Sequence, residues 1–372
     1  MTPIYLDYNA STPIAPEVVA AMEPLLRGSF GNPSSGHWAG APAKAALEFA
    51  RGQVASLLGC GADEVVFTSG GSEANNLALK GLFFGRQGRP SHVIATRIEH
   101  PAVLAPCRFL EKLGARVTLV AVDGAGLVDP DDIRKALRSD TFLISVMHAN
   151  NEVGTIQPLA EIARIARGHG VLFHTDAAQS VGKIATRVDD LGVDLLSVAG
   201  HKLYAPKGVG ALYIRRGVEI EPLIHGAGHE SGRRAGTESV LLAAALGKAC
   251  EIAAPAIGMK DVRRLRDLFW NRLESDFGAG IVLNGHSDLR LPNTLNVSFV
   301  GSNGADILAR IPQVAASTGS ACHSGAVTLS PVLAAMGVVQ NIGMGAIRFS
   351  LGRATTEAEI EAVVAALAQA LT

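Results

Sequence analysis

Residues 171 to 214 read VLFHTDAAQSVGKIATRVDDLGVDLLSVAGHKLYAPKGVGALYI. Short apolar runs within this segment predict strands over Val171–Thr175, Asp194–Val198 and Gly210–Ile214. The first two runs end in polar residues, HTD and SVAGHK, where a predicted strand gives way to another element. This alternation is typical of a mostly parallel sheet with helices on both faces, in which ligands bind at the carboxyl ends of the strands.

Four apolar runs nearer the N-terminus repeat this pattern and bring the predicted strands to seven: Glu64–Phe67, His92–Thr96, Arg116–Val122 and Phe142–His148. Helical patterns separate these runs. We therefore predict an α/β fold whose large domain, residues 17–220, contains a mostly parallel seven-stranded sheet.

The pattern changes beyond Gly217. Three helices and two short strands are predicted there: Ser239–Cys250, Val262–Phe277, Leu295–Val300, Ala346–Leu351 and Thr356–Leu371. We expect residues 221–372 to form a smaller α/β domain, to which residues 1–16 add an N-terminal arm.

The composition of the chain indicates which kinds of partner and which cellular compartment to expect. The 372-residue chain carries 33 basic and 34 acidic residues, so its net charge of −1 gives no reason to expect nucleic acid or an anionic membrane as partner. Its four cysteines form no CxxC pair, which favours neither a zinc site nor a disulfide framework. The N-terminus has no secretory pattern, and we expect a cytoplasmic protein that binds a small molecule.

A glycine-rich turn follows one of the predicted strands. TSGGSEANN at 68 to 76 comes directly after the apolar run Val65-Val66-Phe67. A strand that enters a helix through Ser69, Gly70, Gly71 and Ser72 would direct backbone N–H groups at an anion, of which phosphate is the natural choice. Ser and Gly are also ordinary capping residues, so this turn is weak evidence alone.

Two charged side chains are predicted to lie at the same edge of the sheet. Asp176 and Lys202 each follow a predicted strand. A carboxylate there can keep a pyridine nitrogen protonated, and a lysine can form a Schiff base with an aldehyde. With the phosphate turn, these residues indicate a pyridoxal phosphate site, and His100 in IEHPAV supplies a ring that could stack on a flat cofactor. Taken singly, each residue has a structural explanation: a helix cap, a solvated lysine and a structural histidine.

The remaining candidate is a cysteine among small residues. STGSACHSG at 317 to 325 contains Cys322, within a window from Ile311 to Ile347 that has no charged residue. Pro, Gly and Ser residues exclude a membrane helix over this window. A free cysteine is most often a small buried hydrophobe, whereas a thiol in a mobile loop can travel to a substrate. We expect a mobile loop.

The chain resembles the cysteine desulfurases, which are pyridoxal phosphate enzymes of the class V aminotransferase family with the fold called type I. The resemblance covers nearly the whole length, from YLDYNASTP at 5 to 13, through GNPSS at 31 to 35, to RFSLGRATTEAE at 348 to 359. It implies the type I fold, with a large cofactor-binding domain and a smaller C-terminal domain that carries the Cys322 loop.

The resemblance also implies how the cofactor is held. Lys202 would form the Schiff base, Asp176 would pair with the pyridine nitrogen and His100 would stack on the ring. Gln179 would donate to the phenolic oxygen, and Asn151 in HANNEVGT would lie beside the ring.

The phosphate, the substrate and a second subunit are assigned in the same way. The resemblance places Gly71, Ser72 and His201 at the phosphate, together with Thr237 of RRAGTES from a second subunit, and thereby implies a homodimer. Arg348 would bind the substrate carboxylate with Asn151 nearby, and its planar fork suits that task.

The implied reaction converts L-cysteine to alanine and leaves a persulfide on Cys322 for a sulfur acceptor in iron–sulfur cluster assembly or thiolation. His100 and Lys202 would share the catalysis. A selenocysteine lyase would use almost the same residues. An aminotransferase of this fold would not need Cys322, and a non-catalytic scaffold would bind no cofactor.

One position departs from the desulfurase pattern. The family usually has a serine three residues before the lysine, where its hydroxyl helps to hold the phosphate, and this chain has Ala199 there. A neighbouring group or water would have to replace that hydrogen bond. We expect selenocysteine lyases to share such departures. The sequence therefore leaves open whether the substrate is cysteine or selenocysteine.

Overall fold

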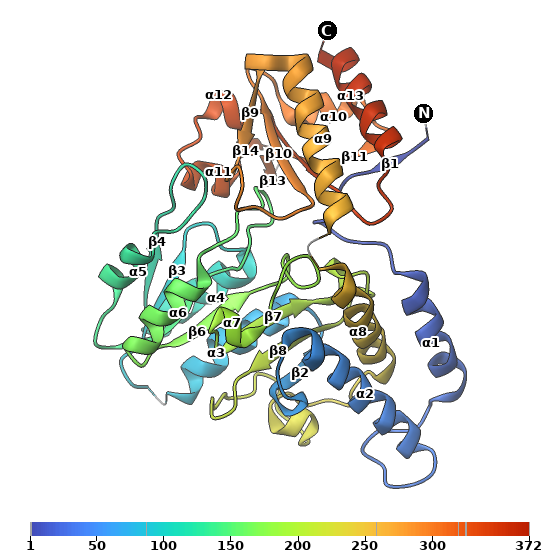
Figure 1. Cartoon of the computed structure of the whole chain (residues 1–372). Coiled ribbons are helices and arrows are strands. Elements are labelled where there is room, and N and C mark those ends of the chain that lie inside the picture. Colours follow the sequence, from blue (N-terminus) through green and yellow to red (C-terminus); the bar gives the residue numbers. More distant parts are fainter. Residues whose placement is uncertain (1, 87, 258, 319, 324–325, 372) are drawn as a thin grey trace.

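The seven predicted strands form one sheet in the computed structural model, which describes residues 2–86, 88–257, 259–318, 320–323 and 326–371 (Figure 1). The strand order is β2-β8-β7-β6-β5-β3-β4. Their bounds are β2 (Val65–Thr68), β3 (His92–Thr96), β4 (Arg116–Val120), β5 (Thr141–Ser145), β6 (Leu172–Asp176), β7 (Leu195–Ala199) and β8 (Gly210–Ile214). Strands β4, β3, β5, β6 and β7 run parallel, and β8 runs antiparallel to both β2 and β7. The prediction of a mostly parallel seven-stranded sheet is confirmed, with ends that differ by a few residues.

Helices cover both faces of this sheet, as predicted for strands that are buried on both sides. The large domain contains α1 (Pro16–Gly28), α2 (Gly40–Leu58), α3 (Gly71–Gly85), α4 (Pro101–Lys112), α5 (Pro130–Ala136), α6 (Leu159–Gly168), α7 (Val188–Leu191) and α8 (Val240–Ala253). One core joins the sheet to α2, α6 and α8, and a second core joins its other face to α3 and α4.

A second, smaller sheet forms the upper part of Figure 1. Its strands, in the antiparallel order β12-β15-β10-β9, are β12 (Ser317–Thr318), β15 (Ala346–Ser350), β10 (Thr294–Phe299) and β9 (Ile281–Asn284). Helices α9 (Lys260–Phe277), α10 (Gly304–Arg310) and α13 (Glu357–Leu371) pack on it around Phe269, Phe299 and Phe349. The N-terminal arm joins this core through Ile4 and Leu6, because β1 (Ile4–Tyr5) pairs with β11 (Val314–Ala315).

The cores place one helix differently from the expected domain division. Helix α8 packs in the core of the large sheet through residues such as Leu246 and Cys250, although the small domain was expected to begin at residue 221. The small core begins with Val262. If each helix is assigned to the core in which it packs, the domain boundary falls between α8 and α9. The change of sequence pattern after Gly217 marks the end of the strands of the large sheet, whereas the core of the large domain continues through α8.

The segment that carries Cys322 is a β-hairpin in its described backbone. Strand β13 (Ser320–His323) pairs antiparallel with β14 (Ala326–Leu329), and Cys322 lies opposite Val327. Two short helices follow, α11 (Pro331–Ala335) and α12 (Gln340–Gly343).

Single turns of 3-10 helix occur at Ala62–Glu64, Gly200–Lys202, His229–Gly232, Ala254–Ala256 and Gly278–Gly280. Across the described residues, no helix combines the length and apolar character needed to cross a membrane.

Candidate active site

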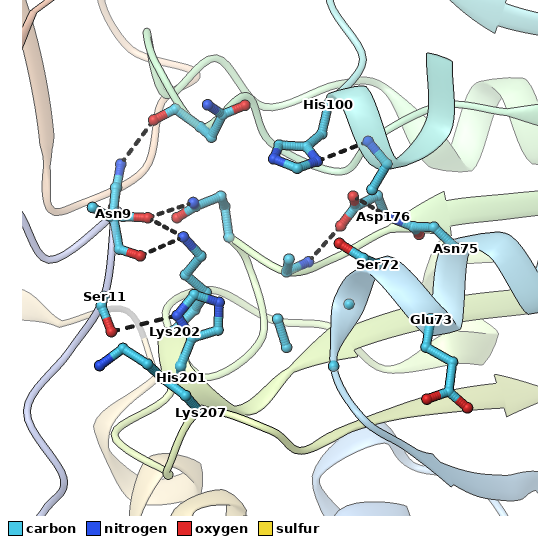
Figure 2. A pocket seen from close by; sticks show the side chains of 18 of the residues that line it. Asn9, Ser11, Ser72, Glu73, Asn75, His100, Asp176, His201, Lys202 and Lys207 are labelled. Atoms are coloured by element: carbon cyan, nitrogen blue, oxygen red, sulfur yellow. Dashed lines mark hydrogen bonds between the residues drawn. The ribbon is translucent and has the colours of Figure 1, made fainter. Parts of the chain in front are cut away.

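A cavity of about 650 Å³ opens where several strands of the large sheet end (Figure 2). Asp176 is the last residue of β6, Ala199 is the last residue of β7, and His100 is the N-cap of α4, the helix that follows β3. The N-terminal arm and β15 complete the lining, with Asn9 and Arg348 respectively. The structure therefore brings most of the predicted site residues into one cavity: Gly71, Ser72, His100, Asn151, Asp176, Gln179, His201, Lys202 and Arg348.

The floor of the cavity includes the start of α3. Gly70 has a φ of +151°, which lets the chain leave β2 and turn directly into the helix. Gly71 has no side chain where it faces the end of β7, and a Cβ there would lie 3.1 Å from the Ala199 Cβ. Gly70, Gly71 and Ser72 line this space, and the N–H groups of the first turn of a helix have no intrahelical partner, which suits an anion.

Asp176 is held by two donors at the edge of the sheet. Asn75 Nδ2 donates to its Oδ2 over 2.7 Å, and the Ala178 N–H donates to its Oδ1 over 2.9 Å. Both Asp176 and Asn75 are buried. Sequence analysis did not single out Asn75, although a polar residue on the inner face of α3, one turn after Gly71, was a readable signal. The carboxylate is thus oriented toward the cavity before any ligand arrives (Figure 2).

Lys202 lies three residues beyond the end of β7, as the last residue of the 3-10 turn Gly200–Lys202. Its Nζ donates to the carbonyl oxygens of Asn9 at 2.5 Å and Ala10 at 2.8 Å. Burial and, to a lesser degree, the positive charge of Arg348 lower the pKa of Lys202 to about 8, against the opposing effect of Asp7 and Asp176. A lysine with a lowered pKa is partly uncharged near neutral pH and can attack an aldehyde.

His100 and His201 contribute rings that stay neutral. The Ala102 N–H donates to His100 Nδ1 over 3.0 Å, so Nε2 carries the proton in the neutral ring. Partial desolvation in the cavity lowers the pKa of His100, Asp176 opposes this effect, and Lys202 acts in the same direction as desolvation. Burial also lowers the pKa of His201 to about 4, aided by Lys202 and Lys207. A neutral ring can stack on a flat ligand or donate one hydrogen bond.

Arg348 faces the cavity from the small sheet. It is buried in β15, and its Nη2 donates to Asp7 Oδ1 at 2.6 Å and to Ser317 Oγ at 2.8 Å. Its Nη1 donates to the Asn151 carbonyl oxygen at 3.0 Å, while its buried Nε has no partner among the described residues. Asp7 was not predicted as a site residue. Its carboxylate accepts a hydrogen bond from Arg348 Nη2, a donor that a substrate carboxylate could otherwise use.

Asn9 connects the two sides of the cavity and was also missed by sequence analysis. This buried residue accepts hydrogen bonds at its backbone oxygen from Lys202 and from Gln179 Nε2, the latter over 3.0 Å. Its side chain contacts Lys183, Asn293 and Thr294. The motif YLDYNASTP was recognised, but nothing in the sequence pattern showed that Asn9 would meet residues nearly 300 positions away.

Cys107 and Cys250 are buried, and Cys60 is half-buried. Burial raises the pKa of Cys60, Cys107 and Cys250 to about 12, so none of these thiols is readily ionised. The side chain of Cys322 lies outside the described residues, as do residues 319, 324 and 325 of the same segment. Its predicted mobility and its role as nucleophile remain predictions.

The structure places Thr237 on the surface of the chain. Its side chain is exposed, and it is not part of the described lining of the cavity. The contribution of Thr237 to the phosphate site of a second subunit stays a prediction.

Comparisons with known proteins agree with this arrangement. The family model of class-V aminotransferases matches residues 4–363. The cysteine desulfurase IscS of Dictyoglomus turgidum is 49% identical over 362 residues, which cover 96% of this chain and 91% of that protein.

Two solved structures have the same fold over nearly the whole chain. A NifS-like protein matches with a TM-score of 0.93 and 37% identity and covers 100% of this chain and 99% of its own. A structure described as SspA in complex with cysteine matches with a TM-score of 0.84 and 39% identity, covering 94% of this chain and 98% of its own. The chain therefore belongs to the class-V aminotransferase family and, within it, to the cysteine desulfurases.

Proposed function

We propose that this protein is a pyridoxal phosphate-dependent cysteine desulfurase that converts L-cysteine to L-alanine and receives the sulfur on Cys322. The observation that carries the proposal is one cavity in which a lysine of lowered pKa, a buried aspartate and a glycine-rich helix start lie together. These three features match the aldehyde, the pyridine nitrogen and the phosphate of that cofactor.

The residues present fit pyridoxal phosphate. Gly71 adds no side chain beside Ala199 at the start of α3, where Ser72 and His201 would donate to the phosphate. Asp176 would pair with the pyridine nitrogen and His100 would stack on the ring. When bound through Lys202, the cofactor supplies an electron sink for chemistry at the substrate α-carbon.

The chain's own groups would then handle the substrate. Arg348 would bind the L-cysteine carboxylate with its planar fork, in competition with Asp7, and Asn151 would border the same space. The Lys202 amine would move the proton at the substrate α-carbon, a role that suits a lysine whose pKa is lowered to about 8. The neutral His100 ring could relay a proton at its Nε2.

Sulfur transfer would require the Cys322 thiolate. Its sulfur would attack the sulfur of the substrate, so that the carbon–sulfur bond of cysteine breaks and a persulfide bond forms on Cys322. The carbon skeleton leaves as alanine, and the atoms balance without another reactant. The hairpin β13–β14 would have to carry this persulfide to an acceptor in iron–sulfur cluster assembly or thiolation.

A homodimer is part of the proposal, with Thr237 of one subunit completing the phosphate site of the other. The exposed position of Thr237 supports this arrangement. Exposed aromatic residues support it as well: Phe30 and Trp38 form an edge-to-face pair, and each is 81% exposed. Large exposed apolar side chains in contact often mark protein interfaces. The cytoplasmic location and the sulfur acceptor remain predictions.

The test is alanine release from L-cysteine by the cofactor-loaded protein, with and without a reductant. We expect turnover that a reductant stimulates, and we expect Cys322→Ala to abolish it. Cys60→Ala is the matched control, because that half-buried thiol has a raised pKa and should not contribute. Alanine release by Cys322→Ala at the wild-type rate would overturn the proposal.

The same assay separates the alternatives. Turnover confined to L-selenocysteine would identify a selenocysteine lyase and would give the Ala199 departure a functional meaning. Keto acid formation that Cys322→Ala leaves unchanged would identify an aminotransferase. A protein that stays colourless with pyridoxal phosphate would be a scaffold.

A further inference from the structure

Lys183 is a buried lysine whose described hydrogen-bond partners are all neutral. It is 6% exposed, and its Nζ donates to Asn9 Oδ1 at 2.9 Å and to Gln179 Oε1 at 3.1 Å. Within the described part of the chain, no carboxylate lies close enough to form an ion pair with it. Buried lysines are rare unless paired, so this one requires an explanation.

The chemistry of an ammonium group decides how its neighbours are oriented. A lysine ammonium has only donors, so it must face the oxygen of a carboxamide and not its nitrogen. Both carboxamides beside Lys183 obey this rule, since Asn9 and Gln179 each present their side-chain oxygen. The Gln179 Nε2 is thereby forced to the opposite side, where it donates to the Asn9 backbone oxygen.

That opposite side is the active-site cavity. Gln179 lines the cavity, and the carbonyl oxygen it contacts also accepts the Lys202 Nζ hydrogen bond. Lys183 itself does not belong to the described lining of this cavity. Lys183 acts on the cavity residues through its charge, and its described hydrogen bonds reach the cavity only through Asn9 and Gln179.

We propose that Lys183 is a positioning residue that fixes the Gln179 carboxamide so that its N–H groups face the cofactor. The inference rests on the proposed function and on the role that the resemblance to cysteine desulfurases implies for Gln179, as a donor to the phenolic oxygen of pyridoxal phosphate. Without Lys183 the carboxamide can rotate by half a turn and present its oxygen to the cavity. Burial and, to a lesser degree, the positive charges of Lys202 and Arg348 lower the pKa of Lys183 to about 7, which agrees with its lack of a charged partner among the described residues.

The first test is the pH midpoint of the colour change of the bound cofactor. A donated N–H stabilises the deprotonated phenolic oxygen, so Lys183→Met should move the midpoint to higher pH by about one unit, a tenfold change in proton affinity. The same substitution in a Gln179→Leu background should produce no further shift, because the route through Gln179 is already lost. Lys260→Met, at an exposed lysine at the start of α9, is the control and should leave the midpoint unchanged.

Equal shifts in both backgrounds, or no shift in either, would overturn the inference. A second measurement needs neither the Lys183→Met variant nor the cofactor. In cofactor-free wild-type protein labelled with ¹⁵N-glutamine, the Gln179 side-chain signal, identified by its loss in Gln179→Leu, should titrate together with Lys183. A signal that does not change with pH would also overturn the inference, whereas failure of the wild-type protein to take up the cofactor would count against the proposed function only.

Discussion

The two sides of the active-site cavity are built in different ways. The side that holds Asp176, Lys202 and the start of α3 comes from neighbouring strand ends of one sheet. The opposite side joins Arg348 of the small sheet to Asp7 of the N-terminal arm and to a loop after β5. The first side is fixed by the sheet, whereas the second depends on how the arm and the small domain pack together. Substitutions on the first side should therefore affect the cofactor, and those on the second should affect the substrate.

The largest effect is expected on the substrate side. Arg348→Gln removes the positive charge that would bind the substrate carboxylate, and it should raise KM for L-cysteine roughly 100-fold. The visible spectrum of the bound cofactor should persist. Steady-state kinetics measures KM, and absorption spectroscopy measures the bound cofactor. Arg310→Gln, in α10 of the same domain, serves as control and should keep KM. Loss of the cofactor in Arg348→Gln would show that the two sides are not separable.

The cofactor side should respond to pH during cofactor loading. Lys202 must be uncharged to attack an aldehyde, and its pKa is lowered to about 8. The rate of colour development, after pyridoxal phosphate is mixed with cofactor-free protein, should therefore level off above pH 8 and fall about tenfold per unit below it. Lys202→Ala should develop no such colour at any pH. A rate that still rises steeply above pH 9.5 would mean that Lys202 has an ordinary pKa.

A smaller change should come from the pair between Asp7 and Arg348. Asp7 Oδ1 accepts from Arg348 Nη2, so the substrate carboxylate must compete with it. Asp7→Asn should lower KM for L-cysteine several-fold, while Asp261→Asn, on the exposed start of α9, should not. A higher KM in Asp7→Asn would instead identify Asp7 as the residue that orients Arg348.

The smallest effect should follow from restoring the hydroxyl of the desulfurase pattern. Ala199 lines the cavity beside Gly71, so Ala199→Ser can add one hydrogen bond to a phosphate. One such bond contributes about 1 kcal/mol, which corresponds to a roughly fivefold gain in affinity for pyridoxal phosphate. Equilibrium titration measures it, and the affinity for pyridoxal, which has no phosphate, is the control. Equal gains for both ligands would place the new hydroxyl away from the phosphate.

Local sequence patterns determined the large sheet and the polar residues at its edge. Apolar runs, turns and polar strand ends lie close together along the chain, and parallel strands bring their carboxyl ends to the same edge. Asp176 and Lys202 were therefore predicted from the strands that precede them, and β3 and β8 have the predicted bounds. The same reasoning could not assign α8, because helical periodicity identifies an apolar face but not the surface it packs against.

Only the tertiary structure decided how the substrate side is assembled and how its charges are balanced. The contacts of Asp7 with Arg348, and of Asn9 with Lys183 and Asn293, join segments that are far apart in sequence. No local pattern encodes such contacts, since they arise when two separate hydrophobic cores bring the arm and the small sheet against the large one. The lowered pKa values of Lys183 and Lys202 have the same origin, because burial and the approach of Arg348 exist only in the folded chain.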